Sequence, residues 1–143
     1  MEKDIRWIQR FNNYRKALTR LSETISQSKE RSLSDIEQAG LIQYFEVTFD
    51  LCWKTLQDLL REKERPNCNG GPSVILRQAM DDGYISGDDQ WLALKKSREL
   101  TSHVYDEEMA TEAVEVIVRV YHGLFIQLET RLQLEKINQE KDR

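Results

Sequence analysis

Apolar side chains recur every three or four residues through the first part of the chain. From Trp7 to Ile25 the spacing alternates between four and three residues without a break. This period matches the turn of an α-helix and places one apolar stripe on one helix face. A helix with such a stripe has to bury it, so the pattern requires partner helices from elsewhere in the chain. The stripe consists of Trp7, Phe11, Tyr14, Leu18, Leu21 and Ile25.

A second and broader helical pattern begins after residue 34. Ser34 and Glu37 have the spacing of a capping box, in which each side chain accepts a hydrogen bond from the other residue's free amide. The pattern should end before Pro66, and its wide apolar surface predicts packing on two sides. The stripe contains Ile42, Phe45, Phe49, Cys52, Leu56 and Leu59, and it is widened by Leu41, Leu51, Trp53 and Leu60.

Two shorter helices are predicted in the middle of the chain. Pro72 suits the first turn of a helix that continues through Met80 and that Gly83 can terminate. The segment 86–89, Ser-Gly-Asp-Asp, offers N-cap candidates for a further helix that continues to about Thr101.

A last long helix is predicted after the acidic segment 106–108, whose negative charge favours a helix start. A charged tail begins at about residue 133. The predicted apolar stripe comprises Ala113, Val116, Ile117, Val120, Leu124, Leu128 and Leu132.

These patterns predict one all-α domain over residues 1–143, with four main helices and one short helix. The short connections favour an antiparallel four-helix bundle. The helices are too apolar for one short bundle to cover, so we expect a homodimer and additional burial at Trp53, Leu60 and Trp91.

Composition restricts the possible functions. A formal net charge of −4 excludes a broad nucleic-acid-coating surface, so any RNA contact should be local. The N-terminus lacks the apolar core of a signal peptide, and no apolar run approaches the length of a membrane span. The two cysteines lack metal-ligand spacing and suggest reduced thiols in the cytoplasm. With neither a glycine-rich phosphate loop nor a paired-aspartate signature, no cofactor or metal is expected.

One short motif combines residues suited to chemistry on a phosphate. Arg98 is followed after four residues by His103 and then, one residue later, by Tyr105. On a helix the first two side chains would point about 140° apart, so the three can converge only if the helix breaks between them. Arginine can hold a phosphate and histidine can transfer a proton near neutral pH. Lys95 and Lys96 can add local positive potential.

Structural explanations exist for the same residues. Arg98 can complement a helix C-terminus, His103 can cap the junction, and Tyr105 can pack with its hydroxyl satisfied. His122 has no arginine at the motif spacing and is expected to be structural. The first helix also carries cations beside its stripe, which either form a solvated face or contact RNA or a partner. These cations are Lys3, Arg6, Arg10 and Arg20.

The motif, placed before the last long helix of a small helical domain, resembles the HEPN superfamily. The resemblance is specifically to its HepT-like toxins, also called nucleotidyltransferase substrate-binding proteins. It covers nearly the whole chain and includes the segment 45–54, in which Phe45, Phe49 and Cys52 precede Trp53 and Lys54.

This resemblance implies an up-and-down four-helix bundle that forms a symmetric homodimer and works with an MntA-type minimal nucleotidyltransferase. In one version the pair is a type VII-like toxin–antitoxin system. Arg98 and His103 then cleave RNA without a metal, and the partner silences cleavage by attaching AMP to Tyr105. In an older version the chain is a non-catalytic substrate-binding subunit, and a purely scaffolding dimer is a third possibility. Glu99 departs from the Asn, Asp or His that follows the arginine in many HEPN nucleases.

Overall fold

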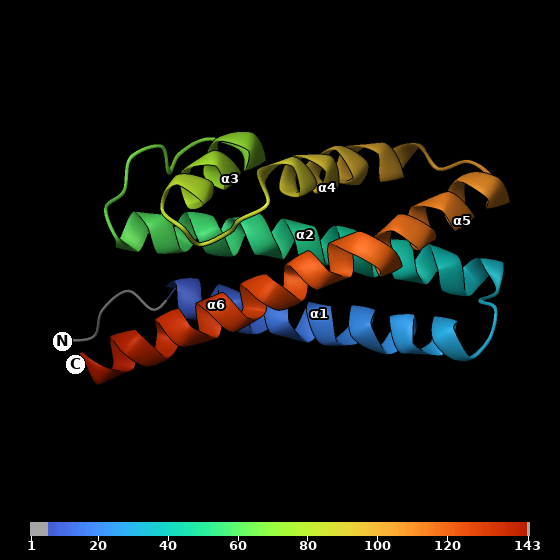
Figure 1. Cartoon of the computed structure of the whole chain (residues 1–143), viewed down its shortest axis with the longest axis horizontal. Helices are drawn as coiled ribbons and strands as arrows, with labels where there is room; N and C mark the ends of the chain where they lie inside the picture. Colours follow the sequence, from blue (N-terminus) through green and yellow to red (C-terminus); the bar gives the residue numbers. More distant parts are fainter. Residues whose placement is uncertain (1–5, 143) are drawn as a thin grey trace.

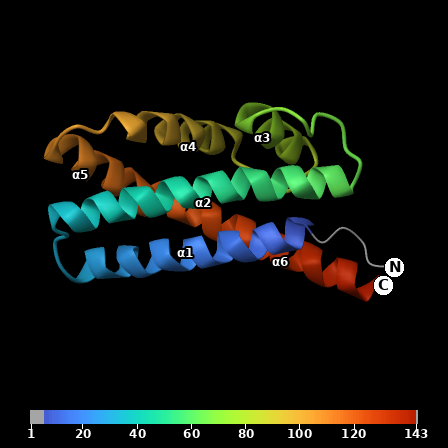
Figure 2. The same cartoon turned by 180° about the vertical axis from the view of Figure 1, so that it is seen from behind.

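The computed structural model describes residues 6–142, and within that range all regular secondary structure is helical, without strands. Its long helices are α1 (Arg6–Glu30) and α2 (Asp35–Glu62), which pack side by side and run in opposite directions (Figure 1). The short helix α3 (Pro72–Asp81) and the helix α4 (Asp88–Leu100) follow one another along α2, on the side away from α1 (Figure 2).

A single-turn 3₁₀ segment, η1 (Thr101–His103), ends α4, and the chain then reverses into the last long helical segment. This segment consists of α5 (Glu107–Val116), a π-helical turn η2 (Ile117–Tyr121) and α6 (His122–Lys141). It crosses α2 and α1 obliquely (Figure 1). Within residues 6–142, no helix is both long and apolar enough to span a membrane.

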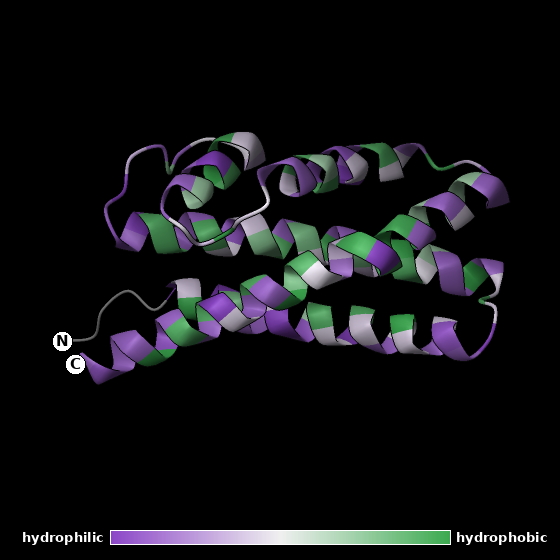
Figure 3. Ribbon diagram, viewed as in Figure 1, coloured by the Kyte–Doolittle hydropathy of each residue, from purple (hydrophilic) through white to green (hydrophobic). Residues whose placement is uncertain are grey.

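The predicted apolar stripes form one core on the inward faces of these helices (Figure 3). All six members of the first stripe are buried, and the capping box of Ser34 and Glu37 is present at the start of α2. Leu60 and Trp91 are already buried within one chain, so the expectation that they gain burial from a dimer is wrong. Trp53 is half-buried.

The N-cap of α4 is Gly87, within the predicted segment 86–89, and its φ of +84° lies in the left-handed region that suits glycine. One local prediction required correction, because the π-helical turn shifts the last stripe. Tyr121 is buried and Val120 only half-buried, because an extra residue in a helical turn rotates the register of the residues after it.

The charged segment from about residue 133 continues α6 to Lys141 rather than leaving the fold. Glu135 is buried there and pairs with Lys63 at 2.7 Å and with Arg131 at 3.3 Å. Trp7 Nε1 donates to Gln139 Oε1 at 3.1 Å and so joins the start of α1 to the end of α6.

Candidate functional site

The helix break predicted by the motif lies at the end of α4. The helix stops at Leu100, η1 comes next, and Val104 adopts an extended conformation with φ −83° and ψ 117°. Asp106 then caps α5, and its side chain accepts a hydrogen bond from the Met109 amide at 2.9 Å. We call the segment 98–106 the junction.

His103 and Tyr105 are both exposed at this junction. The Tyr105 hydroxyl lies 3.5 Å from His103 Nδ1, and 80% of Tyr105 is accessible to solvent. This is a long hydrogen bond, and a proton moving from the phenol to Nδ1 would require the histidine tautomer protonated on Nε2. The break therefore presents an ionisable ring and a nucleophilic hydroxyl side by side to solvent.

Arg98 instead points from α4 to α2, where it binds two carboxylates. Its Nε and Nη2 donate to the two carboxylate oxygens of Asp50 at 3.2 and 3.1 Å, and its Nη1 donates to Glu46 Oε2 at 3.2 Å. The hydrogen bond to Asp50 raises the pKa of Arg98, although partial burial acts in the opposite direction.

These contacts leave part of the guanidinium available. Arginine has five N–H donors, and the pairs with Asp50 and Glu46 use three of them. One donor remains on each terminal nitrogen, and a hydrogen bond from a guanidinium to a phosphate is charge-assisted. The carboxylates therefore fix the position of Arg98 without using all of its donors.

Glu46 also fastens the junction itself. The Thr101 hydroxyl, at the first residue of η1, lies 2.7 Å from the same Glu46 oxygen that accepts from Arg98. Because one carboxylate contacts both residues, the 3₁₀ turn that leads to His103 is tied to α2. Neither Glu46 nor Asp50 was expected from the sequence. Their separation of four residues, on the polar side of a strongly apolar helix, was the available signal.

The lysines upstream supply less positive potential than expected. Lys95 Nζ binds Glu99 Oε1 at 2.6 Å, and this hydrogen bond is the main cause of the lowered pKa of Glu99. Glu99 thus neutralises Lys95 rather than facing Arg98. Lys96 is exposed on the same helix.

Other residues considered from sequence lie away from the junction. His122 Nε2 is 2.7 Å from the Ser22 hydroxyl, and burial lowers its pKa, which fits the structural role expected for it. Arg10 pairs with the buried Asp58 at 3.1 Å. Lys3 lies outside the described residues.

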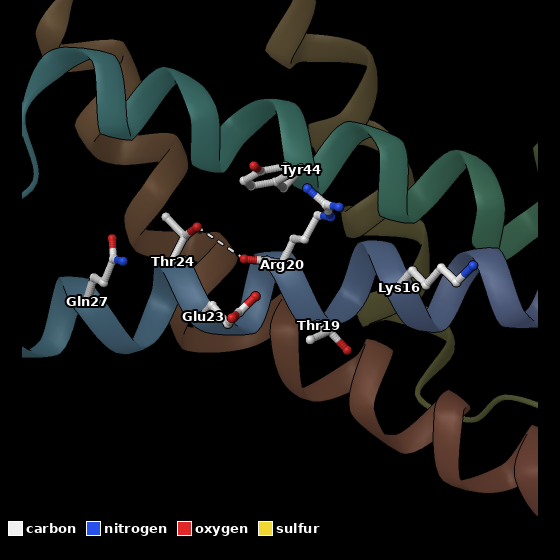
Figure 4. Close-up of a pocket in the computed structure, with 7 residues that line it drawn as sticks. All are labelled: Lys16, Thr19, Arg20, Glu23, Thr24, Gln27 and Tyr44. Carbon is white, nitrogen blue, oxygen red and sulfur yellow. Dashed lines mark hydrogen bonds between the residues drawn. The ribbon is translucent and has the colours of Figure 1, made fainter.

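A separate concavity lies between α1 and α2, and Arg20 points across it toward Tyr44 (Figure 4). Lys16 and Glu23 also line it. Tyr44 precedes Glu46 by two residues, a turn of about 200° around α2, so this surface and the Arg98 cluster lie on opposite sides of the helix. The cations of this concavity therefore do not contribute to the junction.

Comparison with known proteins assigns the family. Residues 9–134 match the family described as "Nucleotidyltransferase substrate binding protein like". The chain belongs to this family.

Two matches in Haemophilus influenzae extend the comparison. The chain is 31% identical over 101 residues to a protein named probable ribonuclease HepT, covering 63% of this chain and 69% of that protein. It also matches a solved structure described as the fold of a substrate binding domain of a nucleotidyltransferase. That match has a TM-score of 0.76 and 28% identity, and it covers 86% of this chain and 98% of the other.

Proposed function

We propose that this protein is a HepT-like toxin, a metal-independent ribonuclease that a partner minimal nucleotidyltransferase silences by adenylylating Tyr105. The observation that carries the proposal is the helix break, which exposes His103 beside Tyr105 while Arg98 is anchored at the preceding turn. These are the residue types that proton transfer and phosphate stabilisation require.

In the cleavage step, His103 acts as the acid or base and Arg98 stabilises the developing charge. The 2′-hydroxyl of the RNA loses its proton, and its oxygen attacks the adjacent phosphorus. The P–O5′ bond breaks, leaving a 2′,3′-cyclic phosphate on one product and a protonated 5′-hydroxyl on the other. The two unused donors of Arg98 face the negative charge that builds on the phosphate oxygens.

In the silencing step, the Tyr105 oxygen attacks the α-phosphorus of ATP on the partner enzyme. Pyrophosphate leaves, and the phenolic proton passes to a base, for which His103 Nδ1 at 3.5 Å is the adjacent acceptor. The product places a bulky nucleotide and a negative phosphodiester at the site where RNA would bind. Because Tyr105 is so exposed, the partner can reach it without unfolding the junction.

We further propose a homodimer built from up-and-down four-helix bundles, which brings two junctions together around one RNA strand. Two exposed apolar side chains, Val47 on α2 and Leu92 on α4, support this assembly, because burying them between protomers would remove apolar surface from water. Light scattering at micromolar concentration should report a dimer, and a monomer would refute the assembly.

One observation favours the alternative of a non-catalytic substrate-binding subunit. Arg98, Lys95 and Lys96 are accompanied by as many carboxylates, namely Glu46, Asp50 and Glu99. This balance weakens the local attraction for RNA.

Expression with and without the partner nucleotidyltransferase decides between the two functions. The toxin should arrest growth when expressed alone. Co-expression should restore growth and add AMP-sized mass to the peptide that contains Tyr105. Tyr105→Phe should remain unmodified and toxic with the partner present. Absence of toxicity, together with an unmodified Tyr105 in a stable complex, would support the substrate-binding subunit instead.

A further inference from the structure

The junction covers a pocket of about 260 Å³ that the proposed chemistry leaves unused. It lies between the end of α4, the middle of α2 and one face of α5. Thr101, the first residue of η1, and Val104, which directly follows η1, both line it. The pocket therefore adjoins the turn that carries His103. Its other lining residues are Phe45, Ser97, Leu100, Met109, Glu112, Ala113, Val116 and Ile117.

The pocket is apolar except for three side chains, and two of these already have partners. The Tyr121 hydroxyl donates to the Ala93 carbonyl at 3.2 Å, so the Ser97 hydroxyl, 2.7 Å away, donates its own proton to Tyr121. The Thr101 hydroxyl is engaged by Glu46 and the Arg98 carbonyl. Neither hydroxyl has a proton left for a ligand.

Glu112 is the third, and it differs from its surroundings. Met109, Ala113 and Val116 stand within one turn of it on α5 and line the same pocket, and all three are apolar. Glu112 is exposed, and among the residues that the structure describes no hydrogen bond or ion pair engages its carboxylate. A carboxylate without a partner at the mouth of an apolar pocket selects for a flat apolar group that carries adjacent hydrogen-bond donors.

We infer that this pocket binds a guanine base of single-stranded RNA, with Glu112 accepting from its N1–H and N2–H groups. Guanine is the RNA base with two neighbouring donors on its Watson–Crick edge. Adenine and cytosine have a hydrogen-bond acceptor beside their amino group, and uracil has one donor flanked by two carbonyl groups. Each of these bases would therefore bring an acceptor lone pair close to a carboxylate oxygen, which is repulsive. Single-stranded RNA is commonly recognised through such edges, with the base face held by apolar or aromatic side chains.

The dimensions of the pocket fit this occupant. A volume of about 260 Å³ lies just below the range of roughly 300–1,000 Å³ typical of pockets for drug-sized ligands. A single base therefore suits it better than a whole nucleotide, and the ribose and phosphate would lie outside, toward the junction. The inference rests on the proposed ribonuclease function for its substrate class and predicts cleavage next to guanosine.

Binding of 3′-GMP, 3′-AMP, 3′-CMP and 3′-UMP to the whole protein, monitored by methyl NMR at Met109 and Ala113, tests the pocket without any cleavage step. All four probes carry the same phosphate, so differences in affinity belong to the base. We expect 3′-GMP to shift both methyl signals and to bind about tenfold or more tightly than the others, as expected for one lost charge-assisted hydrogen bond.

Glu112→Gln should remove this preference, because an amide presents a donor to one of the two guanine donors. Glu115→Gln is the matched control on the same helix. Glu115 pairs with Arg119 at 3.0 Å outside the pocket, and this variant should bind like the wild type. Ala113→Leu should abolish binding by filling the cavity, with circular dichroism confirming the fold.

Several outcomes would overturn the inference: no methyl shift with 3′-GMP, equal affinity for all four nucleotides, or an unchanged preference in Glu112→Gln. Contacts between protomers at these methyl groups, without any 3′-GMP shift, would show that a second copy of the chain fills the pocket. RNA cleavage without a guanosine preference would contradict guanine binding in the pocket but support the ribonuclease function. Selective 3′-GMP binding without RNA cleavage would support guanine binding but contradict the ribonuclease function.

Discussion

The α1–α2 pair and the junction at residues 98–106 divide the molecule into two regions of opposite character. In α1 and α2, long apolar stripes are buried, and hydroxyl groups inside the core have hydrogen-bond partners. The Tyr14 hydroxyl, for example, donates to the Phe125 carbonyl at 2.7 Å. In the junction, η1 contains no buried residue, and His103 and Tyr105 face solvent. This difference shows that the helical core determines the position of the junction, whereas the junction contributes little to the stability of the core.

The largest effect expected from this comparison is on stability. Phe125 is fully buried, and its ring lies 6.3, 6.0 and 6.4 Å from those of Tyr14, Phe45 and Trp91. Phe125→Ala should cost about 3–5 kcal/mol of unfolding free energy, because it removes a large side chain and leaves a cavity. His103→Ala should stay within about 0.5 kcal/mol of the wild type, as is usual for a surface change.

Urea denaturation of the two variants makes this measurement. A loss of stability in His103→Ala comparable to that of Phe125→Ala would break the comparison, because it would make His103 a structural residue.

A smaller effect is expected where the two regions meet, at the ion pairs of Arg98. Arg98→Lys keeps the charge but loses the fork that holds Asp50 and the donors that remain for a phosphate. We expect RNA cleavage to fall by roughly tenfold to a hundredfold through kcat, in the range of a lost transition-state hydrogen bond. The unfolding free energy should change by about 1 kcal/mol or less, since the side chains of both ion pairs remain partly exposed.

Arg119→Lys is the control for the same exchange at an exposed ion pair with Glu115, and it should have no effect on cleavage. Equal cleavage by Arg98→Lys and the wild type would reduce Arg98 to a structural link between α4 and α2.

The smallest expected effect concerns acidic residues beside the junction. A hydrogen bond with the Asp35 carboxyl is the main cause of the raised pKa of Glu107. A carboxyl whose pKa is higher in the folded state than in the unfolded state destabilises the fold when it is ionised. The lost stability is recovered as the pH falls through the folded-state pKa toward the unfolded-state pKa. At pH 7, Glu107→Gln should therefore melt at a higher temperature than Glu108→Gln, which removes the same charge one residue later.

This difference should disappear near pH 4, where Glu107 is protonated in the wild type. Thermal melts of the two variants at both pH values measure this difference. Identical melting temperatures of the two variants at pH 7 would show that repulsion between the Glu107 and Asp35 carboxylates is negligible.

The same contrast between core and junction explains what the sequence could predict. The stripe from Trp7 to Ile25, the Ser34–Glu37 capping box and the start of α3 at Pro72 are set by residues close together in the chain, and all three are confirmed. The helix break after Arg98 was predictable from the spacing of the motif, since a continuous helix would separate its side chains.

Features that depend on distant contacts were not predictable in this way. Glu46 and Asp50 bind Arg98 across about fifty positions of sequence, and no local pattern specifies that pairing. The π-helical turn allows the Tyr121 hydroxyl to reach Ser97 and the Ala93 carbonyl on α4, which the periodicity of the last helix alone does not indicate.

The most direct test of the central claim is RNA cleavage by the purified protein in excess EDTA, with chemical mapping of the product ends. The account predicts cleavage that EDTA does not inhibit, products ending in a 2′,3′-cyclic phosphate and a 5′-hydroxyl, and a loss of about 10²–10⁴-fold in His103→Ala, the range for a general acid or base. Cleavage that persists in His103→Ala, or that requires Mg²⁺, would contradict it.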